Sequence, residues 1–190
     1  MKLNINYIKK TSKDPSIQEI KFIKNDRIND IDLKDVSKKI FKDELFIENL
    51  IVQKHVKNKN YILINLSKTS TTSEFENIGS KLFDYLELNK IKNTIIYNGK
   101  NQINSLQLEK ILHGAKLKSY SFDLYKSKNK NNKIINIKVI LNNNLKISNY
   151  KKKLDALAEG VFYTRDLVSE PGNILHPDEY VKRVLKLRKL

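Results

Sequence analysis

The sequence contains no cysteine, and its 190 residues include only five glycines and three prolines. The lack of cysteine excludes a disulfide scaffold and thiolate metal sites, and it fits a reducing compartment. The scattered glycines leave no glycine-rich loop that could bind a phosphate. No apolar run approaches the roughly 20 residues of a membrane span, and the first residues alternate like a strand, unlike a signal peptide. These absences predict a soluble cytoplasmic protein with no membrane segment.

Arginine is also scarce, although the net charge is +16. Arginine is the preferred residue for bidentate contacts with bases and phosphates. The joint abundance of Lys, Asn and Ile is the bias expected from an AT-rich genome, which favours a solvated lysine surface. Non-specific phosphate binding stays open, because lysine alone can supply it.

Hydrophobic periodicity predicts an α/β fold with a mixed, partly parallel sheet flanked by helices. Strands are expected at residues 2–8, 18–23, 46–56, 61–66, 93–97 and 134–141, and helices at 32–41, from Ser73, and at 105–117. The polar turn at 57–60 predicts a hairpin. Ser73 and Glu76 fit a capping box, and Ser105 is expected to cap the next helix. The apolar strand at 134–141 is expected to be covered on both faces.

A basic, low-complexity segment at residues 126–133 has no apolar side chain to bury, so it is predicted to be a mobile loop. Its alternative interpretation is contact with nucleic-acid phosphates. The segment contains no aromatic residue that could stack on bases. The candidate contacts are Lys126, Lys128, Lys130 and Lys133.

The longest predicted helix follows, with Ser148 as a possible cap. It ends near Ser169, because Pro171 disfavours a helical residue before it. A further helix starts at Pro177, where proline suits the first turn. The apolar pattern is unbroken at Leu190, so we expect the chain to be truncated there. The broad apolar face expected on the long helix comprises Tyr150, Leu154, Leu157, Ala158, Val161, Phe162 and Val168.

The search for chemistry finds no catalytic and no metal-ligating residues. His55, His113 and His176 fit no metal-ligand spacing, and His113 is expected to be a partly exposed structural histidine. Arg165 and Asp166 lie near the carboxyl end of the long helix. Arg165 suits the negative end of the helix dipole, whereas Asp166 needs a fixed partner.

Residues 155–183 resemble the leucyl aminopeptidase (cytosol aminopeptidase) family, in which a helix ending in Arg-Asp-Leu, a Pro-x-Asn turn and a second proline link two domains. The matching positions, which we interpret as a structural linker, are Arg165, Asp166, Leu167, Pro171, Asn173 and Pro177. The turn asparagine is expected to satisfy free backbone groups. The resemblance implies an amino-terminal, macro-domain-like unit at residues 1–145. Residues 146–190 then form a linker helix and the start of a missing catalytic domain.

The same resemblance implies the activity of a longer protein, which removes amino-terminal residues from peptides. It implies two divalent metal ions, manganese or zinc, held outside this chain, and a hexamer. The first hypothesis is therefore a non-catalytic amino-terminal domain of a metal-dependent aminopeptidase. The alternatives are a basic nucleic-acid-binding module and, third, a fragment that itself cleaves peptides.

Overall fold

The structure is a computed structural model that describes residues 2–9, 17–23, 50–56, 59–66, 71–97, 103–125, 134–140 and 149–187. The predicted helix at 32–41, the cap Ser148 and the basic loop at 126–133 lie outside these ranges. The described elements, in chain order, are β1 (Leu3–Ile8), β2 (Gln18–Ile23), β3 (Ile51–Val56), β4 (Lys59–Asn65), α3 (Thr72–Leu88), β5 (Asn93–Tyr97), α4 (Ser105–Lys118), β6 (Ile135–Ile140), α5 (Asn149–Ser169) and α6 (Pro177–Lys186).

The strands form a six-stranded mixed sheet in the order β1-β6-β5-β2-β4-β3. Four neighbouring pairs are parallel, and β3 pairs with β4 antiparallel. The hairpin predicted from the polar turn is confirmed, with Ile51 opposite Ile64. The predicted α/β fold with a partly parallel sheet is therefore confirmed, because strands separated by helices pair in parallel through crossover connections.

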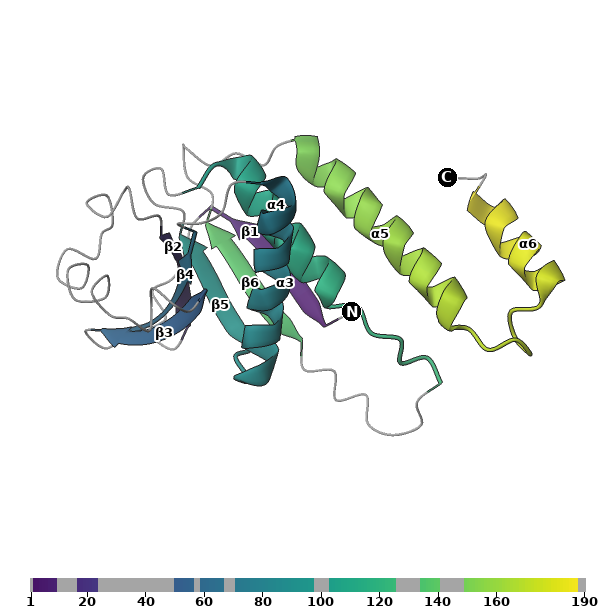
Figure 1. Ribbon diagram of the computed structural model, residues 1–190, viewed down its shortest axis with the longest axis horizontal. Coiled ribbons are helices and arrows are strands. Elements are labelled where there is room, and N and C mark those ends of the chain that lie inside the picture. Colours follow the sequence, from purple (N-terminus) through teal and green to yellow (C-terminus); the bar gives the residue numbers. More distant parts are fainter. Residues whose placement is uncertain are drawn as a thin grey trace.

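Helices α3 and α4 pack together against one side of the sheet (Figure 1). Their contact is close at two glycines. A Cβ atom on Gly79 would lie 1.8 Å from the carbonyl oxygen of Ile111, and one on Gly114 would lie 1.9 Å from that of Glu76. Each glycine therefore lets the backbone of one helix touch the other. Helical spacing in the sequence predicts one apolar stripe on α3, and the structure confirms that it is buried. The stripe comprises Phe75, Ile78, Gly79, Leu82, Phe83 and Leu86.

Both predicted helix caps are wrong by one or two residues. Thr71 caps α3: its hydroxyl accepts a hydrogen bond from the amide of Glu74, whose carboxylate accepts one from the Thr71 amide. Asn104 and Gln107 form the same box on α4. The sequence around Thr71 fits the box pattern in two registers, and only the residue with extended backbone can act as the cap. Ser73 and Ser105 lie inside their helices.

Strand β6 was expected to be covered on both faces, but its two faces are covered unequally. Ile135, Ile137 and Val139 are buried, whereas the alternate residues are only half-buried. The reason is the alternation of its sequence, since a strand presents successive side chains to opposite faces.

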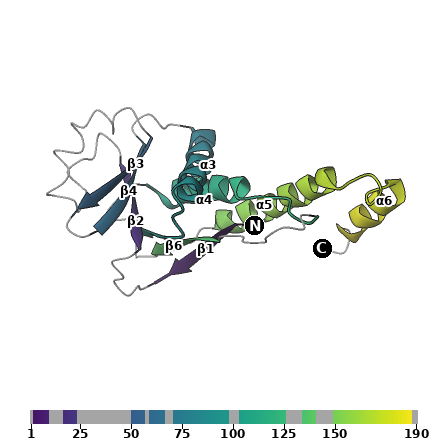
Figure 2. The same ribbon diagram turned by 90° about the horizontal axis from the view of Figure 1, so that it is seen from below.

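Helices α5 and α6 extend away from the sheet, with α6 at the far end (Figure 2). The predicted end of α5 at Ser169 and the start of α6 at Pro177 are both confirmed. Among the described residues, no helix is both long enough and apolar enough to cross a membrane.

Candidate functional site

The first half of α5 packs against α4. Leu154 and Ala158 are 4% and 0% exposed. Asp155 beside them forms ion pairs with Lys116 of α4, at 2.9 Å, and with Lys151 of its own helix. Burial alone would raise the pKa of Asp155, but the hydrogen bonds from the two lysines lower it below its usual range. A charged cluster thus fixes this end of α5.

The second half of α5 contacts the segment that follows α4. Arg165 donates from Nη1 to the carbonyl oxygen of Leu117 at 2.8 Å, and its guanidinium lies 5.4 Å from the centroid of the Tyr120 ring. The Tyr120 hydroxyl donates to Asp166 at 2.8 Å. The prediction that Asp166 has a fixed partner is confirmed. Arg165 serves the carboxyl end of α4 instead of its own helix, because Leu117 belongs to the last turn of α4.

The turn between α5 and α6 is closed by the carbonyl oxygen of Pro171, which accepts from the amides of Ile174 and Leu175, both at 2.9 Å. Pro177 opens α6, and its preceding residue, His176, makes no side-chain cap. Asn173 is exposed, and its side chain has no hydrogen bond within the described part of the chain. The expected role of Asn173 in satisfying the turn is therefore not seen.

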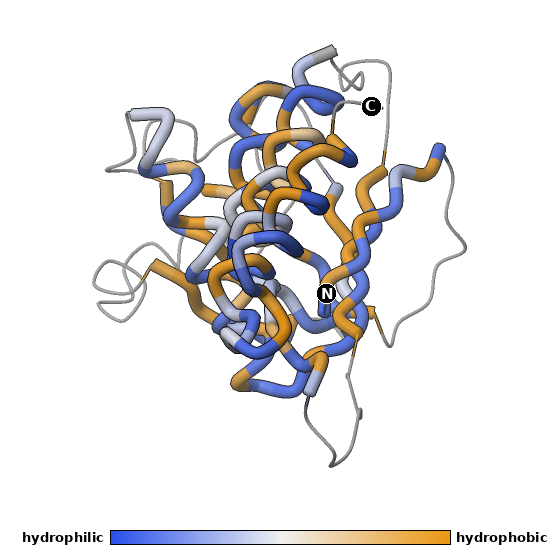
Figure 3. Tube along the Cα trace, turned by 90° about the vertical axis from the view of Figure 1, so that its right-hand side faces the viewer, coloured by the Kyte–Doolittle hydropathy of each residue, from blue (hydrophilic) through white to orange (hydrophobic). Residues whose placement is uncertain are grey.

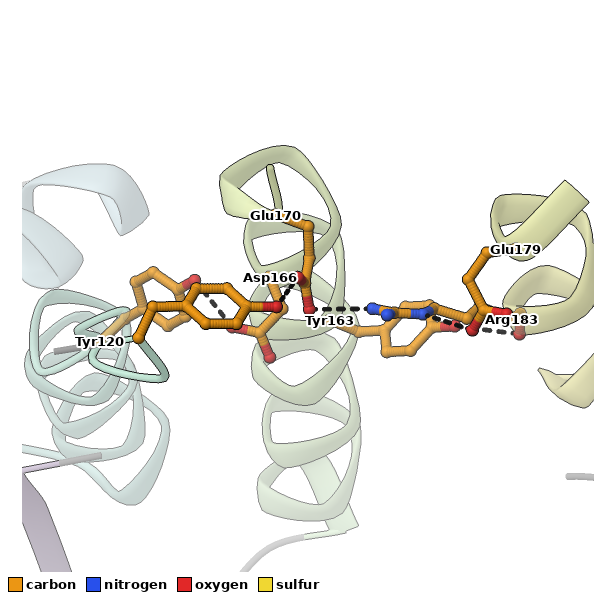
Figure 4. A network of polar contacts seen from close by, with 7 residues as sticks. Tyr120, Tyr163, Asp166, Glu170, Glu179 and Arg183 are labelled. Atoms are coloured by element: carbon orange, nitrogen blue, oxygen red, sulfur yellow. Dashed lines mark hydrogen bonds and ion pairs between the residues drawn. The ribbon is translucent and has the colours of Figure 1, made fainter. Parts of the chain in front are cut away.

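A polar network ties α6 back to α5 (Figure 4). Arg183 of α6 forms ion pairs with Glu170, at 3.0 Å, and with Glu179, at 3.2 Å. Tyr163 of α5 donates to the carbonyl oxygen of Arg183 at 2.9 Å. Tyr125 donates to Glu170, whose side chain is only 5% exposed. These contacts connect three segments: the one after α4, the end of α5, and α6.

Hydrogen bonds from Tyr125 and Arg183 lower the pKa of Glu170 below its usual range. A lowered pKa in the folded state means that this carboxylate stabilises the network above its unfolded pKa of about 4.3. That contribution is lost as the pH falls through the still lower folded value. Acid therefore weakens the link between α5 and α6.

We expect Arg183→Gln to loosen α6 without unfolding the sheet, because Arg183 is the centre of the network. The measurement is the heteronuclear ¹⁵N NOE of residues 177–186, which falls in the variant at pH 6. The original chain shows the same fall only below about pH 4.3. Lys182→Gln, at an exposed neighbouring position, is the control and leaves the NOE unchanged. An equal fall in both variants would contradict the assigned role of Arg183.

The apolar residues of α6 are uncovered in this structure, and none of the helix is buried. Leu157 and Val168 of α5 are also exposed, at 54% and 81%, although both were expected on a buried stripe. Figure 3 views the molecule from this end and shows hydrophobic stretches alternating with hydrophilic ones along the chain. The exposed apolar residues of α6 and its last turn are Tyr180, Val181, Val184, Leu185 and Leu187.

The described residues contain no group of three or more His, Asp or Glu side chains that could hold a metal ion. His55 is exposed and paired with Asn60, and His176 lies before α6. His113 is 4% exposed, so the expected partial exposure is wrong. It is buried because α4 turns this residue towards β1 and α5. The candidate site is thus the linker. It contains Arg165 and Asp166, which contact the end of α4 and Tyr120, and Pro171 and Pro177, which lie in the turn and at the start of α6. The structure adds Tyr120, Tyr125, Tyr163, Glu170 and Arg183.

Sequence reasoning missed this network. Only the spacing of Glu179 and Arg183, four residues apart on a helix, signalled any part of it. The arrangement is an α/β domain joined by α5 to α6, whose apolar residues are exposed.

Comparisons with known proteins show which proteins this chain resembles. No family model matches. The chain is 39% identical over 93 residues to a probable cytosol aminopeptidase of Phytoplasma mali (strain AT), a match that covers 46% of the chain and 19% of that protein. It is 31% identical over 135 residues to a probable cytosol aminopeptidase of Wolbachia pipientis wMel, which covers 67% of the chain and 26% of that protein.

Solved structures agree in fold. A mutant of tomato leucine aminopeptidase superposes with a TM-score of 0.67 at 13% identity, covering 99% of this chain and 42% of that one. The bottromycin maturation enzyme BotP in complex with Mn gives a TM-score of 0.56 at 14% identity, covering 90% and 35%. The predicted resemblance to the leucyl (cytosol) aminopeptidase family is confirmed, and it concerns the amino-terminal domain. The chain spans about a fifth to a quarter of the length of these curated relatives, whose matched shares are 19% and 26%.

Proposed function

We propose that this chain is the non-catalytic amino-terminal domain and linker of a metal-dependent, leucyl-type aminopeptidase. The longer protein would remove amino-terminal residues from peptides during protein turnover in the cytoplasm, and it would assemble as a hexamer. Residues 1–145 would form the domain, and residues 146–190 the linker helix and the start of the catalytic domain. The observation that carries this proposal is the similarity to cytosol aminopeptidases over up to 135 residues, in matches covering 26% of the relative or less.

The uncovered apolar side of α6 supports the same proposal. Tyr180 and Leu185 are each 48% exposed. A contiguous exposed apolar surface marks a site of contact with another protein part. Because the matches cover only 19% and 26% of the relatives, the rest of such a protein is available to cover α6.

The role that follows for this chain is to set the orientation of the part that continues from α6. Arg165 contacts the end of α4 and Asp166 contacts Tyr120, and these contacts fix the direction of α5. Arg183 fixes α6 against α5. Whatever continues from α6 is therefore held in a set orientation to the sheet domain.

Metal chemistry belongs outside this chain in our proposal. Two divalent ions, manganese or zinc, would polarise the scissile carbonyl and activate a water. The described residues do not fit such ions, since none of their carboxylates and histidines cluster in groups of three. BotP was solved in complex with Mn, which supports a divalent metal for the longer protein.

Reading the coding sequence beyond Leu190 tests the proposal. We expect the coding sequence to continue beyond Leu190 into a domain rich in Asp, Glu, Lys and Gly. A stop codon at that position, or a continuation without metal-ligating carboxylates, would overturn it. A limited proteolysis experiment on the longer product is expected to cut outside residues 177–187, because the catalytic domain would cover α6.

A second function, non-specific nucleic-acid binding, is favoured by the net charge of +16. We expect weak duplex DNA binding whose logarithmic salt slope falls when lysines that contact phosphate are removed. The variant replaces Lys126, Lys128, Lys130 and Lys133 with glutamine; the control replaces Lys182 and Lys186 of α6. Undetectable DNA binding at low salt would contradict this function. An unchanged salt slope in the variant that lacks the four lysines would also contradict it.

A further inference from the structure

A cavity of about 280 Å³ lies where the edge strand β1 meets α4 and α5. Each helix contributes a polar row at helical spacing: Glu109, His113 and Lys116 from α4, and Lys151, Asp155 and Glu159 from α5. Leu112 and Leu154 add apolar surface. The size is that of a small metabolite, just under the usual range for drug-sized ligands. The cavity is separate from the linker network at the other end of α5.

His113 lines this cavity, and one polar atom of its ring is buried without a partner. The side chain is 4% exposed, and its Nδ1 is buried without a hydrogen-bond partner. A buried nitrogen without a partner is costly and uncommon. Nδ1 has almost no accessible surface, so it faces protein and not the open space of the cavity. Burial lowers the pKa of His113, so the ring is neutral at pH 7.

One positive and one negative side chain that line the cavity can each form further hydrogen bonds. Lys116, whose side chain is 14% exposed, pairs only with Asp155 in the described part of the chain. An ammonium group has three donors, so further N–H groups are free to bind an acceptor. Glu159, on the same side of α5 as Asp155, has no partner among the described residues.

We propose that this cavity binds a small zwitterion, of which a free α-amino acid is the simplest. The ligand carboxylate would accept hydrogen bonds from Lys116, and its ammonium group would donate to Glu159. A singly charged ligand would leave one of these groups unused. Because the cavity is shared by β1, α4 and α5, an occupant would also hold the linker helix against the sheet domain. This inference does not depend on the proposed peptidase function.

The test is an NMR titration of the 190-residue chain with glycine, alanine and leucine, following the His113 ring and the amides of α4 and α5. We expect saturable shifts with a Kd on the order of 1 mM, as suits a ligand of so few atoms. Acetate and methylammonium, which carry one charge each, are expected to bind at least about tenfold more weakly.

Three variants locate the site. Lys116→Met keeps the apolar stem but lacks the ammonium group, and Glu159→Gln removes one exposed charge without affecting folding. Each is expected to weaken binding by about tenfold. Lys152→Met, on an exposed face outside the cavity, is the control and leaves binding unchanged. Absence of saturation at 50 mM (about 50 times the expected Kd), equal shifts from the singly charged probes, or equal weakening in all three variants would overturn the proposal.

Discussion

Replacing Gly79 with alanine is expected to destabilise the chain by about 3 kcal/mol or more, because the added methyl has no space. Its Cβ would lie 1.8 Å from the Ile111 carbonyl oxygen, which is backbone and cannot rotate away. The two helices must then separate, and the apolar residues between α3 and the sheet lose contacts. Gly114→Ala is expected to have a similar effect, since its Cβ would lie 1.9 Å from the Glu76 carbonyl oxygen. Urea unfolding followed by circular dichroism measures the change.

Gly160→Ala is the matched control. Gly160 lies in the middle of α5, and a Cβ there would meet nothing within 4 Å. Alanine is a better helix former than glycine, so this variant is expected to stabilise α5 by about 0.5–1 kcal/mol. A Gly79→Ala variant as stable as Gly160→Ala would show that α3 and α4 are not in backbone contact.

Leu154→Ala is expected to release α5 from the domain. Leu154 and Ala158 are the residues of α5 that the structure buries, at 4% and 0% exposure, so the leucine carries much of the apolar contact with α4. Truncating a buried leucine costs about 2–5 kcal/mol. Native-state hydrogen exchange of the α5 amides measures the free energy of opening this helix, and we expect it to fall by about that amount.

Leu157→Ala provides the control on the same helix with the same chemistry. Leu157 is 54% exposed, so its truncation is expected to change the opening free energy by less than about 0.5 kcal/mol in this chain. In the proposed longer protein, where a further domain would cover this side, the same substitution is expected to cost more. Equal effects of the two leucine variants in this chain would contradict the packing of α5.

Local sequence signals predicted most of the elements. Asn93–Tyr97 is predicted and observed as a strand with the same bounds. Four residues of β-forming character, 94–97, precede the turn dipeptide Asn98-Gly99 in the sequence. Pro171 fixed the end of α5 correctly, since proline restricts the residue before it whatever the tertiary context. Such signals act within a few residues, which is why they can be read from one sequence.

Features that depend on a distant partner could not be predicted. Gly79 was placed on the apolar stripe of α3, but nothing local shows that the backbone of Ile111 lies against it. Leu157 and Val168 fit the helical period of α5, yet both are exposed. Leu157 lies between the buried Leu154 and Ala158 but on an uncovered side of the helix, and Val168 lies beyond them. Periodicity predicts which side of a helix is apolar; it does not predict how much of that side is covered.

In the candidate site, too, local features were predicted from the sequence and contacts with distant residues were not. Arg165 and Asp166 were assigned structural roles from their place on the helix. Arg165 contacts the end of α4, and Asp166 contacts Tyr120 in the segment after it. Their partners were missed, because Tyr120 is 46 residues from Asp166 and Tyr125 is 45 residues from Glu170. No pattern in the sequence joins residues at such separations.

The central claim is that this chain positions a catalytic domain and performs no chemistry itself. It is tested most directly by assaying leucine p-nitroanilide hydrolysis, with manganese or zinc, by the 190-residue chain and by the longer gene product. The account predicts turnover by the longer protein, lost on chelation of the metal, and none by the 190-residue chain. Turnover by the chain alone, or a longer product that hydrolyses no amino-terminal residue, would contradict it.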